Sequence, residues 1–399
     1  MRIADQIARA AERDAMFSFL EAPAESLAVD RDQAVSEGRL SGLLVGVKSN
    51  ISVAGQAWTA GIRGRSSEIA DDDAEVVGVL RRAGAVMLGR LTMDEAALGA
   101  ATETSGFRAT QNPEASGRSV GGSSGGAASA VASGALQVAL GSDTLGSVRI
   151  PASYCGVLGL KPGPGLLPMG GVFPLAEGFD TVGLLARETR VLNDILDLFG
   201  AEAETRHASV KSAMPGAQVV CDPGVADALE QAQMLFEQEG RWSGRLQVAG
   251  WSAAPVRMAA YSLVCARAVN SLADQPVAGR AVEKALAFGQ RLSAEEITAA
   301  QTLCDRAAEG LRQAVSDNTV LLTPTTPDPA FPRGTKPPSS QADFTAIANL
   351  AGLPALAVPI PSGDLPQSVQ LIGPQGSERT LLSLADILLR AGSLSQTQA

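Results

Sequence analysis

The chain has 399 residues, of which 45% are hydrophobic and 4% aromatic, and its formal net charge is −10. This length and apolar share provide material for a large core, and the length alone allows two or three domains. The acidic balance, the lack of a basic cluster and the few aromatic residues argue against binding to nucleic acid or to an anionic membrane.

The first segment of the chain predicts two helices, at residues 2–15 and 23–37. Charged residues interrupt the first helix, which argues against a signal peptide, and no run of ~18 apolar residues predicts a membrane span. Four scattered cysteines without a C-x-x-C pair are typical of a reducing compartment, and with a single histidine they predict no metal site. We therefore expect a cytoplasmic protein.

Strands and helices alternate in the next part of the chain. An apolar strand at 43–48 ends at Lys48, a helix at 74–82 takes its N-terminal cap from three aspartates at 71–73, and a buried strand follows at 85–88. This alternation predicts an α/β fold, with helices on both faces of a mixed, mostly parallel, twisted central sheet.

The stretch from Gly121 to Ser147 is the most informative one. It reads Gly-Gly-Ser-Ser-Gly-Gly at 121–126, then a helix of small residues that ends near Gly134, an apolar strand at 136–140 and a second loop that carries Ser147. A flexible linker does not fit, because the flanking residues are apolar and periodic. Neither phosphate-binding loop pattern can be placed on it. Ser147 does not stand in a G-x-S-x-G elbow, because Val148 and Arg149 follow it. The stretch predicts two serine-bearing loops on a rigid support.

A reactive serine needs a base, and the sequence offers two kinds. His207 is the single histidine and lies in a polar segment after a helix, which is typical of a solvated surface residue. A lysine is the alternative when burial or a neighbouring cation lowers its pKa. Lys48 at the end of its apolar strand is the candidate, although spacing alone favours a strand-end lysine in solvent.

Later segments predict further elements of the same kind. Helical periodicity is present at 189–199, 226–238 and 255–270, with a strand-like segment at 246–249. Ser293 and Glu296 have the spacing of a capping box, which predicts the start of a long helix that runs to about residue 315.

These motifs resemble the signature of the amidase signature family. The family's lysine-bearing strand is similar to Gly46-Val47-Lys48, and its two serine loops are similar to residues 121–126 and 141–152. Further similar segments stand at 91–95, 155–162, 321–325, 349–354 and 369–373. The family's catalytic set is Ser-Ser-Lys, so the resemblance implies Ser147 as nucleophile, Ser123 as bridging serine and Lys48 as base. It also implies a cis peptide bond between Gly122 and Ser123.

The resemblance implies supporting roles as well, with no cofactor and no metal. The backbone N–H groups expected in the oxyanion hole are those of Thr144, Leu145, Gly146 and Ser147. The candidates for substrate binding are Met93, Gly121, Gly122 and Leu145. The residues expected to support the loops are Asp143, Arg149 and Ser124. Leu145 replaces a family glycine, and we expect it to have negative φ and to narrow the acyl pocket.

The implied organisation is one amidase domain over residues 1–399. It comprises a signature core at about 40–200, a variable substrate-pocket region at about 205–290 and a C-terminal part of the same sheet at about 293–390. The expected activity is metal-independent hydrolysis of a small carboxylic or urea-derived amide to the acid and ammonia or an amine. A homodimer is compatible with this, and neither nucleic-acid nor membrane partners are expected.

Two alternatives to a self-standing amidase stay open. The first is the amidase-like subunit of a tRNA-dependent amidotransferase, against which the short middle region and the lack of basic surface count. The second is a catalytically inactive relative that serves as a binding or scaffold protein. Its mark would be the loss of a triad residue, and all three are present.

Overall fold

The computed structural model describes residues 8, 12, 38–103, 107, 109–204, 208–215, 219–315 and 318–396. All but two positions of the predicted helices at 2–15 and 23–37 lie outside the described residues, and so does His207.

Ten described strands form one mixed sheet. They are β1 (Leu44–Lys48), β2 (Val86–Leu91), β3 (Val138–Asp143), β4 (Leu158–Lys161), β5 (Thr181–Ala186), β6 (Ser209–Ala213), β7 (Trp242–Leu246), β8 (Thr319–Pro324), β9 (Ala355–Ile360) and β10 (Gln367–Ile372). Their order across the sheet is β2-β1-β3-β5-β4-β9-β10-β8-β6-β7.

The strand directions differ between the centre of the sheet and its ends. Parallel pairs join β2, β1 and β3 at one end and β8, β6 and β7 at the other. The five pairs between them are antiparallel. The mixed sheet is therefore confirmed, whereas parallel pairs are not the majority. A short connection is enough between the antiparallel strands β9 and β10, whereas the parallel pairs need longer crossovers.

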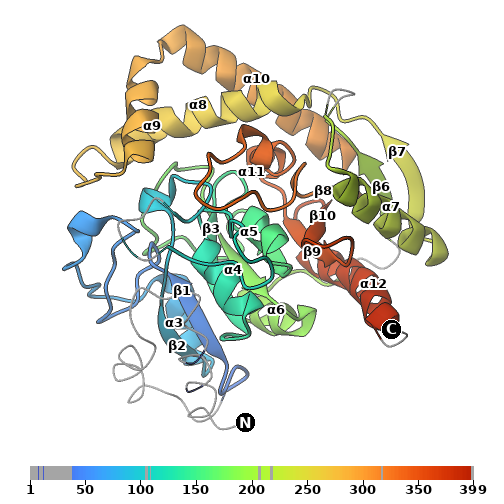
Figure 1. Cartoon of the computed structure of the whole chain (residues 1–399), viewed down its shortest axis with the longest axis horizontal. Helices are drawn as coiled ribbons and strands as arrows, with labels where there is room; N and C mark the ends of the chain where they lie inside the picture. Colours follow the sequence, from blue (N-terminus) through green and yellow to red (C-terminus); the bar gives the residue numbers. More distant parts are fainter. Residues whose placement is uncertain are drawn as a thin grey trace.

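Helices cover both faces of this sheet, as predicted (Figure 1). The helices are α3 (Glu75–Arg82), α4 (Gly125–Ala132), α5 (Arg149–Tyr154), α6 (Thr189–Leu196), α7 (Pro223–Gln238), α8 (Ala253–Ser271), α9 (Arg280–Arg291), α10 (Ala294–Ala314), α11 (Ala346–Leu350) and α12 (Glu378–Gln396). Strand β3 shows how the faces separate. Its Val138 and Leu140 belong to the core shared with α3, α6, α7 and α12, whereas Ala139 packs in the core with α4 and α5.

A third group of helices lies over the edge of the sheet at which β2 and β3 end. Figure 1 shows α8, α9 and α10 together there, beside α11. Their apolar residues share a cluster with Met93, Phe173 and Phe179, which we call the cap cluster. The predicted helix at 255–270 is thus confirmed as α8, while α9 had not been predicted and β7 lies before the predicted 246–249.

Helix caps show where local rules hold and where they fail. Ser293 Oγ accepts from Glu296 N at 3.2 Å and Glu296 Oε2 accepts from Ser293 N at 2.8 Å, so the capping box is confirmed. The cap predicted for α3 is wrong, because its N-cap is Ala74 and no side chain caps it. Asp73 instead accepts from Ala54 N and pairs with Arg81.

No helix in the described ranges combines the length and the apolar character that a membrane crossing requires.

Candidate active site

Lys48 is the last residue of β1, and its side chain is completely buried. Its Nζ lies 2.8 Å from Ser123 Oγ, 2.9 Å from Ser142 Oγ and 3.4 Å from Ser142 O. Because β1 pairs with β3, the Lys48 side chain contacts Ser142 on the neighbouring strand instead of extending into solvent. The strand-end lysine in solvent, which spacing alone favoured, is therefore wrong.

Burial lowers the pKa of Lys48 to about 7, although the charges of Asp94, Asp143 and Asp180 act in the opposite direction. Near neutral pH a substantial fraction of the amine is thus uncharged. A neutral amine has two N–H groups and one lone pair. Both acceptors on Ser142 can take the N–H groups, which leaves the lone pair for the hydroxyl of Ser123.

Ser123 follows a cis peptide bond with Gly122, as the resemblance implied. The backbone around it is closely packed. Ser123 O accepts from Asp94 N at 3.2 Å, and a Cβ on Gly122 would lie 2.1 Å from Asp94 Oδ2, so only glycine fits. Gly121 has φ of 74°, a conformation that also favours glycine. Met93 is completely buried in the cap cluster.

Ser147 lies half-buried in the turn between β3 and α5. Its carbonyl accepts from Ser124 N at 3.1 Å, which brings the two predicted serine loops side by side. Ser124 Oγ also donates to Ser142 O at 3.1 Å. Ser124 thus contacts both loops.

A buried ion pair holds the ends of this turn together. Arg149 donates from Nε and Nη2 to the Asp143 carboxylate at 3.0 and 2.9 Å, and both side chains are fully buried. Burial alone would raise the pKa of Asp143, but Arg149, together with Asn349 and Lys161, holds that pKa well below its usual range. The predicted bracing contact is present.

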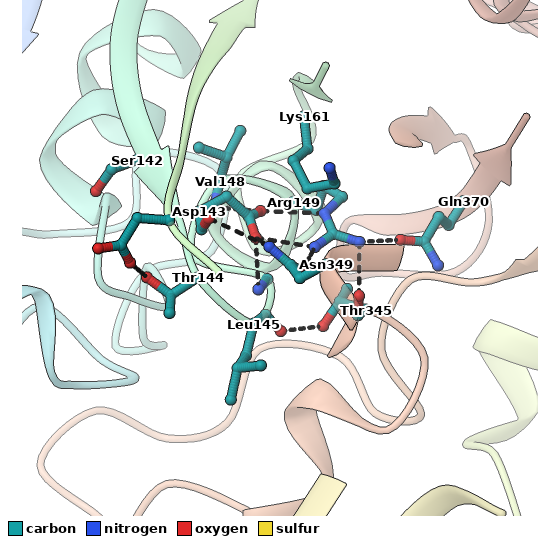
Figure 2. A network of polar contacts seen from close by, with 12 residues as sticks. Ser142, Asp143, Thr144, Leu145, Val148, Arg149, Lys161, Thr345, Asn349 and Gln370 are labelled. Atoms are coloured by element: carbon teal, nitrogen blue, oxygen red, sulfur yellow. Dashed lines mark hydrogen bonds and ion pairs between the residues drawn. The ribbon is translucent and has the colours of Figure 1, made fainter. Parts of the chain in front are cut away.

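The same arginine reaches residues that are about 200 positions away in the chain (Figure 2). Its guanidinium donates to Thr345 O at 2.9 Å, Gln370 Oε1 at 2.6 Å and Asn349 Oδ1 at 2.5 Å. Asn349 Nδ2 donates in turn to Asp143 Oδ1 at 3.0 Å. The nucleophile turn is therefore fixed from the C-terminal part of the sheet.

The backbone N–H groups of the turn have different partners. Gly146 N donates to Asp143 Oδ1 at 2.7 Å, so this group, one of the four predicted oxyanion donors, is already occupied. Val148 N donates to the other carboxylate oxygen at 3.1 Å. Within the described part of the chain, the N–H groups of the other three predicted donors, Thr144, Leu145 and Ser147, donate to no protein acceptor.

As expected, the φ angle of Leu145 is not positive. The neighbouring Gly146 has a positive φ instead, of 133°. A Cβ on Gly146 would lie 2.3 Å from Thr345 Oγ1, the group that donates to Leu145 O. Figure 2 shows the Leu145 side chain pointing away from the Asp143–Arg149 network. It packs against the cap cluster.

Two residues near the triad were not predicted. Ser142 binds Lys48 and also accepts from Asn50 Nδ2 at 3.0 Å. Asp180 accepts from Thr144 Oγ1 at 2.7 Å. Ser142 lies on β3 directly before Asp143, and nothing in the spacing along the chain indicates either Ser142 or Asp180. The described residues contain no group of three or more His, Cys, Asp or Glu that could hold a metal ion.

Comparison with known proteins agrees with this architecture. The model of the Amidase family matches residues 2–232 and 247–382. The glutamyl-tRNA(Gln) amidotransferase of Thermus thermophilus has a subunit that is 34% identical, over 90% of this chain and 86% of that protein. A solved amidase superimposes with a TM-score of 0.85 at 26% identity, covering 98% of this chain and 96% of the other.

A second solved structure widens the range of similar enzymes. It is a 6-aminohexanoate cyclic dimer hydrolase bound to its substrate, with a TM-score of 0.83 at 25% identity and coverage of 97% and 92%. The family model matches most of the chain, and the buried lysine contacts the first serine loop. This chain therefore belongs to the amidase family and is an enzyme that acts on amide C–N bonds.

Proposed function

We propose that the protein hydrolyses a small carboxylic or urea-derived amide through an acyl-enzyme on Ser147. The observation that carries this proposal is the contact of 2.8 Å between Ser123 Oγ and a completely buried Lys48, whose pKa burial lowers to about 7. A lysine that is neutral near pH 7 is able to act as a base, whereas a charged lysine is not.

In the proposed reaction Ser123 gives its proton to Lys48 and accepts the proton of Ser147. The Ser147 oxygen then forms a bond to the amide carbon. In this proposal the N–H groups of Leu145 and Ser147, which have no protein acceptor in the described part of the chain, stabilise the oxyanion. Each such donor contributes roughly 3–4 kcal/mol to the transition state. The proton returns through Ser123 to the leaving nitrogen, and water cleaves the acyl-enzyme to the acid.

A second candidate is that the chain serves as the amidase-type subunit of a tRNA-dependent amidotransferase. The identity of 34% to the Thermus thermophilus protein over most of both chains supports this candidate more than a self-standing amidase. It requires protein partners and a route for the released ammonia. The net charge of −10 means that a partner would have to supply most of the tRNA contact.

The test of the first proposal is labelling with a fluorophosphonate followed by mass spectrometry of the modified peptide. We expect label on Ser147, none in Ser147→Ala, and an unchanged fold of that variant by circular dichroism. Ser123→Ala and Lys48→Ala should each lose several orders of magnitude in kcat, and the double variant little more, because the two act as one relay. Label on another residue would contradict the assignment.

Glutamine and a panel of simple amides separate the two candidates. Turnover of simple amides by the isolated chain supports a self-standing amidase. Turnover of glutamine alone, increased by partner subunits and charged tRNA, supports the amidotransferase role. Labelled enzyme without turnover of any amide would place the chain's substrate outside both classes.

A further inference from the structure

We propose that Asp180 is a positioning residue, which fixes the turn that carries Leu145 and Ser147 by holding Thr144. The inference rests on the proposed roles of Ser147 and of the turn's N–H groups. Asp180 directly precedes β5, the strand that pairs with β3, so that it faces the end of β3 from the neighbouring strand.

The Asp180 carboxylate is held by three donors. Thr144 Oγ1 donates to Oδ1 at 2.7 Å, and the N–H groups of Leu175 and Ala176 donate to Oδ2 at 2.9 and 2.8 Å. Each oxygen thus has a fixed set of partners. An asparagine at this position can keep the two backbone bonds through its oxygen only if its NH₂ group donates to the Thr144 hydroxyl. The bond to Thr144 is then reversed and has no charged partner, which makes it weaker.

The loop at 175–180 is itself anchored to a helix of the cap. Arg267 on α8 donates to Glu177 O at 2.8 Å, and its guanidinium lies 4.3 Å from the ring centroid of Phe179. Phe179 belongs to the cap cluster, against which Leu145 also packs. A continuous series of contacts therefore leads from α8 through this loop to the turn of Ser147.

Asp180 and Asp143 bind opposite ends of the turn. The Asp143 carboxylate fixes Gly146 N and Val148 N, whereas Asp180 fixes the side chain of Thr144. The N–H of Leu145 lies between these two anchors, and its direction depends on both. A displacement of about 1 Å in such a group can cost ~10²-fold in rate.

The charge of Asp180 bears on Lys48 as well. The charged groups around Lys48 are Asp94 after β2, Asp143 on β3 and Asp180 before β5, and Arg90 on β2 donates to the lysine carbonyl at 3.2 Å. Asp143 forms an ion pair with Arg149, whereas Asp180 has no ion-pair partner among the described residues. Burial raises the pKa of Asp180 itself, against its three hydrogen bonds and the charge of Lys48.

The test compares Thr144→Val, Thr144→Ser and Asp180→Asn, with Thr189→Val as the matched control. Thr189 Oγ1 makes the same kind of bond, to Asp386 Oδ1 at 2.6 Å, between α6 and α12. The readouts are kcat, KM and the pH profile with the amide of highest kcat/KM from the panel, the rate of fluorophosphonate labelling at Ser147, and the thermal midpoint.

We expect Thr144→Val to lower kcat by roughly 10- to 100-fold while KM changes less than about threefold, because the turn contributes more to the transition state than to substrate binding. Thr144→Ser should keep most of the activity. Asp180→Asn should also lower kcat, because a weaker, uncharged hydrogen bond then holds Thr144. It should move the acidic limb of kcat/KM to lower pH, because a lost negative charge favours neutral Lys48.

The control variant Thr189→Val should lose stability without change in kcat or in the pH profile. Values of kcat within twofold of wild type in Thr144→Val and Asp180→Asn would overturn the inference. An equal loss of kcat in Thr189→Val would also do so, since the effect would then follow stability alone. A wild-type enzyme that is not labelled at Ser147 overturns the proposed function together with this inference.

Discussion

Lys48 is able to act as a base only in its neutral form, and its pKa of about 7 sets the pH range in which activity should appear. Below this pKa the amine is protonated, so kcat/KM should rise with pH through about 7 and then level off. Profiles measured between about pH 5.5 and 9 test this. The residual activity of Lys48→Ala should have lost the dependence, and His207→Ala should keep it. A flat wild-type profile would rule out a lysine base.

Leu145 should determine the size of the acyl group that the enzyme accepts, because its side chain packs toward the cap cluster and away from the bracing network. In Leu145→Gly we expect relative kcat/KM to move toward bulkier acyl groups by roughly 1–3 kcal/mol across a graded series of amides. An unchanged order of substrates would place the side chain outside the pocket. A uniform loss would mean that it supports the shape of the turn.

At the scale of single elements, the capping box of α10 should contribute to stability without contributing to catalysis. Ser293→Ala removes the acceptor for Glu296 N and should lower the free energy of unfolding by about 1 kcal/mol, with kcat unchanged. Urea denaturation measures this. Thr298→Ala, inside the same helix, is the control and should not destabilise, since its hydroxyl only bonds back to Ala294 O. Equal losses in both variants would argue against the cap.

Elements with strong periodicity could be predicted from the sequence, and those defined by their neighbours could not. The helices α6, α7, α8 and α10 follow their apolar faces closely. The antiparallel centre was missed because strands buried on both faces, such as β4 and β5, are buried at every position and carry no sign of direction in their sequence. The aspartate cap predicted for α3 is wrong because Asp73 instead binds Ala54 N and Arg81.

The candidate site shows the same division. Lys48, Ser123 and Ser147 were predicted through a family resemblance, and the chain's own spacing did not single out the lysine. Ser142 and Asp180 were missed because their contacts run between adjacent strands, from β3 to β1 and from the start of β5 to the end of β3. Which strands are neighbours is a property of the whole sheet, so spacing along the chain does not reveal such contacts.

At the scale of the whole molecule, two buried lysines should make stability depend on pH. Burial lowers the pKa of Lys48 to about 7, and burial together with Arg149 lowers the pKa of Lys161 to about 7. Above that pH the unfolded chain binds more protons than the folded one, so the free energy of unfolding should rise with pH, by up to roughly 1.4 kcal/mol per unit for each lysine. The window closes near pH 9, because burial raises the pKa of all four cysteines above their ordinary value of 9.0. Above about pH 9 their four protons outweigh those of the two lysines, and the slope changes sign.

Urea unfolding at several values between about pH 7 and 8.5 measures this slope. Lys161→Met should reduce it, whereas Lys336→Met, at an exposed position, should leave it unchanged. A slope that does not differ between the two variants would mean that Lys161 is solvated in the folded enzyme.

The bracing of the turn by Thr345, Asn349 and Gln370 has a consequence for the synthesis of the protein. A ribosome releases Lys48, Ser123 and Ser147 long before it releases these partners, so a nascent chain carries all three reactive groups while Arg149 still lacks its later contacts. The ion pair of Asp143 and Arg149 would then be buried with unsatisfied donors, which is unfavourable. Reactivity at Ser147 should therefore appear only when translation is almost complete, and fragments that stop before residue 345 should remain inert in the cell.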